Sequence, residues 1–229
     1  MKISVPSKSG HVHVQLAETD KLHMLHPKSI VAFRGEPQLR EDRLMDLAGM
    51  YRKKKWVRSL LHGPSEFVIG LPSGCNVETV PIENNGNLLF DIRHVLFFSD
   101  GITMKPVVQK MKNAWITKEF VRMRFDGPGE LGIMAPGDIS AVSLHPDTPL
   151  YVDTAALVAY PEQASIRLSV YGNKLASQSM NIQWEIKGNG PVLIQTGSRD
   201  PALEAQLQND GIIKRILREV LPFGSVYIK

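Results

Sequence analysis

The chain of 229 residues contains a single cysteine, Cys75. One thiol excludes an intramolecular disulfide and a thiolate-based metal site, because each needs more than one cysteine. No apolar run approaches the roughly 20 residues that a transmembrane helix needs. The first residues, MKISVPSKSGHVHV, also lack the apolar segment of a signal peptide. These absences favour a soluble, cytoplasmic protein that folds around a hydrophobic core without covalent cross-links.

Basic residues exceed acidic residues only slightly, with 27 Lys and Arg against 23 Asp and Glu. Much of the basic excess falls in one short segment, formed by Arg52, Lys53, Lys54, Lys55 and Arg58. Such a cluster can bind nucleic acid or an anionic membrane, or it can be a solvated loop. Nucleic-acid readers usually interleave basic and aromatic residues over a longer stretch, so the solvated loop is the preferred interpretation.

Long helical patterns are scarce, whereas 18 Gly and 15 Pro separate many short apolar segments. Alternating or continuous apolar runs of strand length recur from HVHVQL at residues 11–16 to PVLIQT at 191–196. Turn sequences such as HGPS, DGPG and KGNG lie between them. The pattern predicts an all-β fold, a sandwich or barrel of many short strands.

Two segments depart from the strand pattern. Residues 38–48 place leucines at near-helical spacing before Gly49, which predicts a short helix. Near the end of the chain, Asp200 and Pro201 suit the cap and first position of a helix. Apolar residues then continue at helical spacing, so a C-terminal helical segment is predicted over 199–221.

Internal similarity is the most informative feature of the sequence. HGPSEFVIGLPSG at 62–74 matches DGPGELGIMAPGD at 126–138, and FDIRHVLFF at 90–98 matches VDTAALVAY at 152–160. We therefore predict one repeated β domain over 1–198, with units at 62–125 and 126–198 and a partial copy at 21–61. The structural turns of the repeat are assigned to Gly63, Pro64, Gly127, Pro128, Gly129, Gly188 and Gly190.

At these segments the sequence resembles the bacterial members of the Altered Inheritance of Mitochondria family, the family of the twenty-fourth protein of that name. The matching blocks include FDIRHVLFFSDG, RMRFDGPGELGIMAPGDISAVSL, YVDTAALVAYPEQASI and IKGNGPVLIQTGSRDPAL, between about Lys21 and Leu203. The resemblance implies the TRAP-like fold, a repeated β-sandwich or double-stranded β-helix that assembles into a ring such as a homotrimer. It implies no catalytic mechanism and no cofactor, and fold likeness alone does not transfer RNA or tryptophan binding.

His11, His13 and Glu18 form the one spacing that points to a metal, because cupins use a similar His-x-His and Glu arrangement. Alternation places both histidines on one face of a strand, where two imidazoles can share a metal. The glycines of the cupin pattern are missing, since Val5 and Leu25 stand at their positions. The alternative is that both histidines lie on the solvated face of an N-terminal strand.

No local signature of nucleophilic catalysis is present, and no catalytic residue is predicted. Asp91 and Asp153 occupy equivalent repeat positions, where each either anchors its own turn or takes part in a paired-carboxylate site. The sequence thus favours a non-enzymatic, homo-oligomeric β scaffold or binding protein whose subunits associate through edge strands or sheet faces. The alternatives are a cupin-like metal or small-molecule enzyme and a binder of nucleic acid or anionic membrane.

Overall fold

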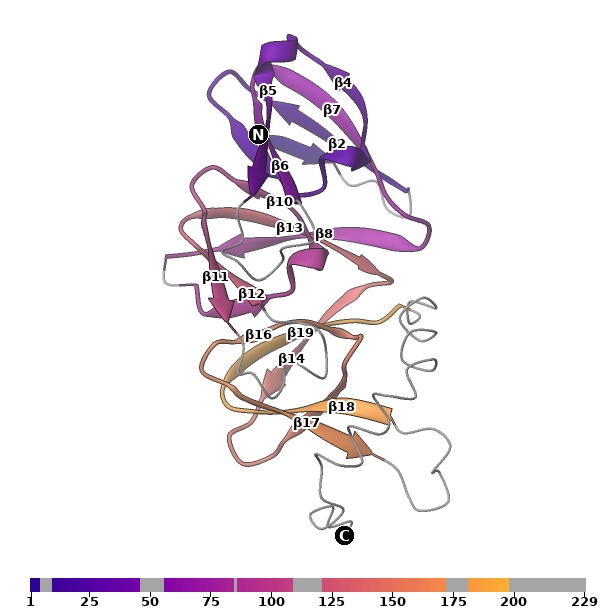
Figure 1. The fold of residues 1–229 in the computed structure, drawn as a ribbon, viewed down its shortest axis with the longest axis vertical. Helices are drawn as coiled ribbons and strands as arrows, with labels where there is room; N and C mark the ends of the chain where they lie inside the picture. Colours follow the sequence, from indigo (N-terminus) through magenta and orange to yellow (C-terminus); the bar gives the residue numbers. More distant parts are fainter. Residues whose placement is uncertain (5–9, 46–55, 85, 109–120, 172–180, 198–229) are drawn as a thin grey trace. The chain divides into compact units, whose positions relative to one another are not determined.

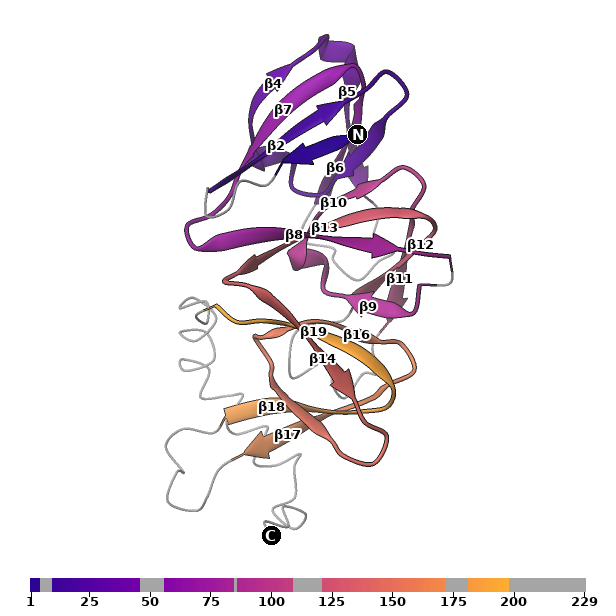
Figure 2. The same cartoon turned by 180° about the vertical axis from the view of Figure 1, so that it is seen from behind.

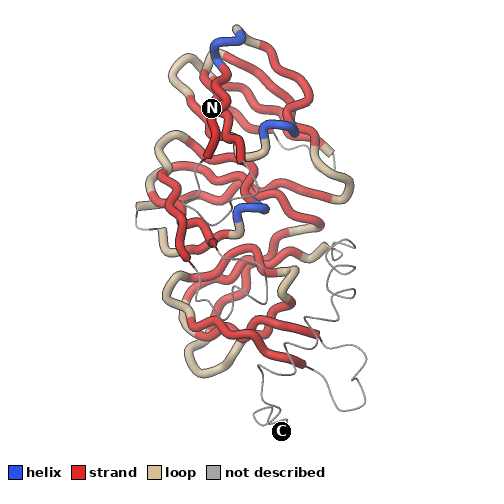
Figure 3. Tube along the Cα trace, in the orientation of Figure 1, coloured by secondary structure: helices blue, strands red, loops and turns tan. Residues whose placement is uncertain are grey.

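The computed structural model of the chain describes residues 1–4, 10–45, 56–84, 86–108, 121–171 and 181–197. All of them belong to one compact unit, Met1–Gly197. Strands make up most of the described residues, and the only helices among them are three short 3-10 turns (Figure 3). None of the helices in this part of the chain is long and apolar enough to cross a bilayer. The predicted C-terminal helical segment, 199–221, lies outside the described residues.

Three repeats of six strands follow one another along this unit (Figure 1). Repeat 1 consists of β2 (His11–Leu16), β3 (Lys21–Met24), β4 (Ile30–Arg34), β5 (Arg40–Met45), β6 (Trp56–His62) and β7 (Ser65–Gly70), and β1 (Lys2–Ser4) precedes it. Repeat 2 consists of β8 (Cys75–Ile82), β9 (Leu88–Phe90), β10 (Val95–Ser99), β11 (Thr103–Val108), β12 (Val121–Asp126) and β13 (Gly129–Pro136). Repeat 3 consists of β14 (Ile139–Leu144), β15 (Leu150–Asp153), β16 (Leu157–Pro161), β17 (Ser165–Tyr171), β18 (Asn181–Lys187) and β19 (Gly190–Gln195). The 3-10 turns are η1 (Pro27–Ser29), η2 (Pro37–Leu39) and η3 (Ile92–His94).

The predicted all-β, internally repeated fold is therefore confirmed. The first repeat contains all six strands, so it is longer than the 21–61 range in which the sequence similarity is visible. Its strands keep the same order of pairing as the other two repeats although few residues match. Strand pairing depends on alternation of apolar side chains, which many different residues can supply.

Each repeat splits its strands between two sheets. The first, sixth and third strands pair side by side, as in β2-β7-β4, and the second, fifth and fourth do the same, as in β3-β6-β5. Adjacent repeats join where β3 pairs with β10 and where β9 pairs with β16, both antiparallel. The results are two six-stranded sheets, β5-β6-β3-β10-β13-β8 and β11-β12-β9-β16-β19-β14, each shared by two repeats (Figures 1 and 2). The terminal sheets are smaller, β1-β2-β7-β4 and β15-β18-β17.

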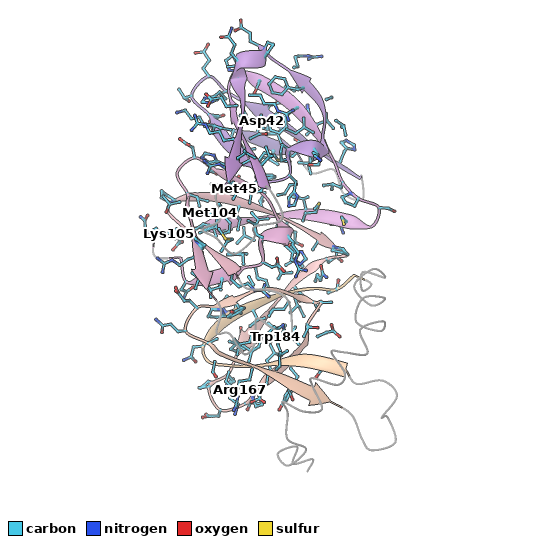
Figure 4. All side chains as sticks on the ribbon, in the orientation of Figure 1. Asp42, Met45, Met104, Lys105, Arg167 and Trp184 are labelled. Carbon is cyan, nitrogen blue, oxygen red and sulfur yellow. The ribbon has the colours of Figure 1, made fainter. Side chains whose placement is uncertain are left out.

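Three hydrophobic cores correspond to the three repeats. Phe67 and Leu61 represent the core of repeat 1, Phe90 and Phe125 that of repeat 2, and Trp184, which Figure 4 labels, that of repeat 3. Each core packs the two sheets of its own repeat face to face, as in a small β-sandwich. No single repeat of about 60 residues buries much surface alone, so stacking the repeats enlarges the cores.

Neighbouring repeats also exchange side chains between their cores. A bulge in β10 between Val95 and Phe97 turns Leu96 and Phe97 toward the core of repeat 1. The equivalent bulge in β16 turns Val158 and Ala159 toward the core of repeat 2. All four of these exchanged side chains are fully buried. The bulges therefore supply the packing between repeats.

The helix predicted at residues 38–48 is wrong where the structure describes it. The segment forms η2 and then β5, which pairs antiparallel with β6 from Arg40 opposite Leu61 to Met45 opposite Trp56. Cross-strand pairing here overrides a helical spacing of only a few leucines. Met45 packs against the core of repeat 2, as does Met104 of β11 (Figure 4). Residues 46–48 lie outside the described part.

Candidate functional site

The predicted metal residues begin on β2, where the expected alternation is present. Val12 and Val14 are fully buried, whereas His11 is exposed and His13 is half-buried. His13 Nε2 lies 2.7 Å from Glu66 Oε1, and Arg34 donates to Glu66 Oε2 at 2.9 Å. Hydrogen bonds from Gln15 and His13 hold the pKa of Glu66 below its ordinary value. Glu66 on β7 is therefore the hydrogen-bond partner of His13.

Glu18 does not join the two histidines, because it lies exposed in the turn that follows β2. The described residues contain no group of three or more His, Cys, Asp or Glu side chains that could hold a metal ion. His11, His13 and Glu18 thus do not come together as a ligand set. The arrangement provides a histidine–carboxylate–guanidinium chain on the surface of the first sheet.

Only the last residue of the predicted basic segment lies within the described structure. Arg52, Lys53, Lys54 and Lys55 fall outside it. Arg58 lies on β6, directly opposite Arg43 of β5. Burial lowers the pKa of His23, and the positive charge of Arg58 lowers it further. Arg58 therefore affects the pKa of His23 on β3 as well as contributing to the surface charge.

The glycines and prolines predicted to mark the repeat lie at the turns between the fifth and sixth strands. Gly63 and Pro64 connect β6 to β7, and the corresponding turns lead into β13 and β19. A side chain at Gly63 would overlap the backbone carbonyl of Ala17. Gly127 has φ of +118°, a conformation that L-residues with a side chain rarely adopt. Backbone geometry therefore accounts for the glycines at these turns.

A buried charge cluster that the sequence did not predict surrounds η3. Asp91 is 5% exposed and accepts a 2.9 Å hydrogen bond from the Arg93 backbone N–H. The Arg93 guanidinium also donates to the Asp91 carboxylate, and Arg122 of β12 lies 3.8 Å from it. Burial alone would raise the pKa of Asp91, but the charge of Arg122 and the hydrogen bonds from Arg93 hold it well below the ordinary value.

This cluster has a structural role in the fold. Arg122 is 2% exposed and stacks over the Tyr160 ring of β16, 5.8 Å from the ring centroid, so it joins repeats 2 and 3. The equivalent Asp153 accepts a 2.9 Å hydrogen bond from the Ala155 backbone N–H. Each aspartate thus anchors its own turn, as one of the two sequence interpretations proposed. No sequence spacing indicated Arg122, because it comes from a distant strand.

Two strands at opposite ends of the repeat series have one sheet edge without a partner among the described residues. β4 pairs only with β7, and β15 pairs only with β18. The equivalent strands inside the series, β10 and β16 or β3 and β9, are paired on both edges. Val31 on β4 is 67% exposed, and Tyr151 on β15 is 52% exposed. Exposed apolar side chains on open sheet edges are features of strand-mediated association.

The fold and the site together define a class of protein, a serial stack of three β-sandwich repeats with open terminal edges. A family model described as "Mitochondrial biogenesis AIM24" matches residues 7–197, and the chain belongs to this family. A crystal structure of a protein from Streptococcus pyogenes is similar in fold, with a TM-score of 0.64 at 13% sequence identity. The similarity covers 94% of this chain and 99% of the streptococcal chain. Comparison with curated proteins gives no match.

Proposed function

We propose that the protein is a non-enzymatic β scaffold that self-associates through its two terminal strands. The observation that carries the proposal is the exposure of Val31 on β4 and of Tyr151 on β15, each on an unpaired edge. Burying such side chains against another surface on an unpaired edge would stabilise an association. A second molecule would supply such a surface.

Four of the other edge strands carry features that oppose pairing. β5 presents four consecutive charged residues, Arg40–Arg43, and β8 contains Pro81. β11 contains the exposed Lys105 followed by Pro106, and β17 carries Arg167, which is also exposed (Figure 4). Charge and proline on an edge strand are the usual protection against unwanted strand addition. β4 and β15 have neither a proline nor a run of charges, and unlike the uncharged edge strand β14 they carry a large exposed apolar side chain, which supports them as the association sites.

Light scattering after size exclusion tests the proposal directly. We expect the protein to elute as a multiple of 25.5 kDa, with a trimer the favoured ring. Val31→Lys should shift the protein toward the monomer, because a charge would be buried at the new edge. Leu44→Lys is the matched control, since Leu44 is also 67% exposed but lies on the charged strand β5.

The result that overturns the proposal is a monomer at micromolar concentrations for the unaltered chain. If Val31→Lys and Leu44→Lys weaken the oligomer equally, association does not run through the terminal edges. Far-UV circular dichroism of both variants shows whether each retains the strand content of the unaltered protein.

A further inference from the structure

The two internal junctions between repeats share one geometry. At the first junction, Phe97 lies opposite Met24 and Phe98 lies opposite His23. At the second, Ala159 lies opposite Phe90 and Tyr160 lies opposite Leu89. A further backbone hydrogen bond extends each junction, from Leu25 N–H to Leu96 C=O at 2.9 Å and from Asp91 N–H to Val158 C=O at 3.0 Å. The register is thus the same at both junctions.

Each junction also buries apolar side chains in both directions. The third strand of the later repeat sends its bulge residues into the earlier core, as with Val158 and Ala159. The second strand of the earlier repeat sends a side chain into the later repeat. Leu89 belongs to the core of repeat 3, and the His23 ring lies 4.7 Å from the Phe98 ring. The junction is therefore an exchange of side chains along a continuous sheet.

β4 and β15 correspond to the two strands that pair at each internal junction. β4 is the third strand of repeat 1, the first repeat among the described residues, and β15 is the second strand of repeat 3, the last repeat among them. Pairing with the sixth strands aligns Val31 with Leu96 and Val158, and aligns Ala32 with Phe97 and Ala159. The equivalents of Val31 are fully buried, but Val31 itself is exposed.

The same alignment explains the exposed tyrosine on β15. Tyr151 precedes Val152 and Asp153 just as Leu89 precedes Phe90 and Asp91. Leu89 is 3% exposed because the next repeat covers it, whereas no described repeat follows that of Tyr151, which is 52% exposed. Both halves of a third junction are therefore present in one chain, one at each end of the series.

Resting on the proposed self-association, we infer that β15 of one molecule pairs antiparallel with β4 of the next, in the register of the internal junctions. Val152 then lies opposite Ala32, Tyr151 opposite Phe33 and Leu150 opposite Arg34. The β17-β18-β15 sheet and the β4-β7-β2-β1 sheet merge into one continuous sheet across the two molecules. Because the two edges differ, the contact is head-to-tail, and it closes into a ring or extends as a filament according to the rotation per molecule.

Inter-molecular disulfide formation tests this register. Two proteins are prepared in a Cys75→Ser background, one with Ala32→Cys and one with Val152→Cys, and are mixed under mild oxidation. Directly opposed residues in an antiparallel pair have Cα atoms close enough for a disulfide. We expect the mixture to give a cross-linked species of twice 25.5 kDa that reverts on reduction. Each protein incubated alone should give far less of it.

The matched control replaces Ala32→Cys with Ser140→Cys, which lies exposed on the uncharged edge strand β14. If light scattering shows an oligomer while the Ala32–Val152 cross-link is absent or no stronger than the cross-link at Ser140→Cys, that result overturns the proposed register but not the self-association. A monomer overturns the proposed function itself. If Val152→Cys fails to fold, the neighbouring pair Phe33→Cys and Tyr151→Cys provides the same test.

Discussion

Gly132 and Phe97 form a pair in which the lack of a side chain makes room for a ring. They lie opposite each other on β13 and β10, and a Cβ on Gly132 would lie less than 3 Å from three atoms of the fully buried Phe97 ring. The equivalent pair is alanine with leucine in repeat 3, Ala159 opposite Leu193. The two positions therefore divide a fixed volume, and a large residue on one strand requires a small one on the other.

A double-mutant cycle measures this compensation. We expect Phe97→Ala to cost about 3–5 kcal/mol, because it leaves a cavity in the core of repeat 1. Gly132→Val should cost about 1–3 kcal/mol, because the new side chain overlaps the ring. In the double variant the valine occupies part of the cavity and no longer overlaps the ring, so its destabilisation should fall short of the sum of the two single costs by about 2–3 kcal/mol.

Urea unfolding followed by circular dichroism provides the free energies, provided that the m-value stays constant across the four proteins. Phe125→Ala combined with Gly132→Val is the control, because Phe125 belongs to the core of repeat 2 on the other face of the sheet. That pair should be additive. Additivity within about 0.5 kcal/mol for Phe97 and Gly132 would refute the shared-volume reasoning.

Two further predictions concern buried titratable groups. Asp91→Ala should destabilise the protein by about 3–5 kcal/mol, since it leaves the Arg122 guanidinium buried without the Asp91 carboxylate. Asp153→Ala should cost only about 1 kcal/mol, the contribution of its turn hydrogen bond. Equal losses of unfolding free energy in urea would contradict this difference. Burial lowers the pKa values of His23, His26 and His94, so the unfolded chain binds protons more readily than the folded one. Stability should therefore fall as the pH drops below about 6.5, and a urea midpoint that is unchanged between neutral pH and pH 5 would contradict it.

The sequence predicted the features that depend on neighbouring residues. Alternation in HVHVQL fixed which residues of β2 face the core, and the Gly-Pro turns at Gly63 and Gly127 marked the return into the sixth strand. The helix predicted at 38–48 failed because the spacing of a few leucines says nothing about the partner strand β6. Local pattern identifies a strand, but its neighbours depend on contacts between distant segments.

The candidate site required that long-range information. Nothing in the sequence around Val31 or Tyr151 distinguishes them from their buried equivalents, since Leu96 and Leu89 are apolar as well. Their exposure follows from the position of their repeat in the series, which only the strand order reveals. The ion pair between Asp91 and Arg122 is similar, because Asp91 caps η3 and Arg122 lies on β12, and these segments meet only in the folded chain.

The side chains exchanged at the repeat junctions also determine how the protein loses its structure. Because Val158 and Ala159 of one repeat complete the core of the repeat before it, melting repeat 3 removes part of the core of repeat 2. Such nearest-neighbour coupling raises the cooperativity of a repeat array, so an excised repeat lacks the contacts that hold it in the whole chain. In a monomeric variant such as Val31→Lys, local opening should therefore begin at β4 and β15, whose junctions are incomplete in a single molecule, and amide hydrogens there should exchange before those of β10 and β16.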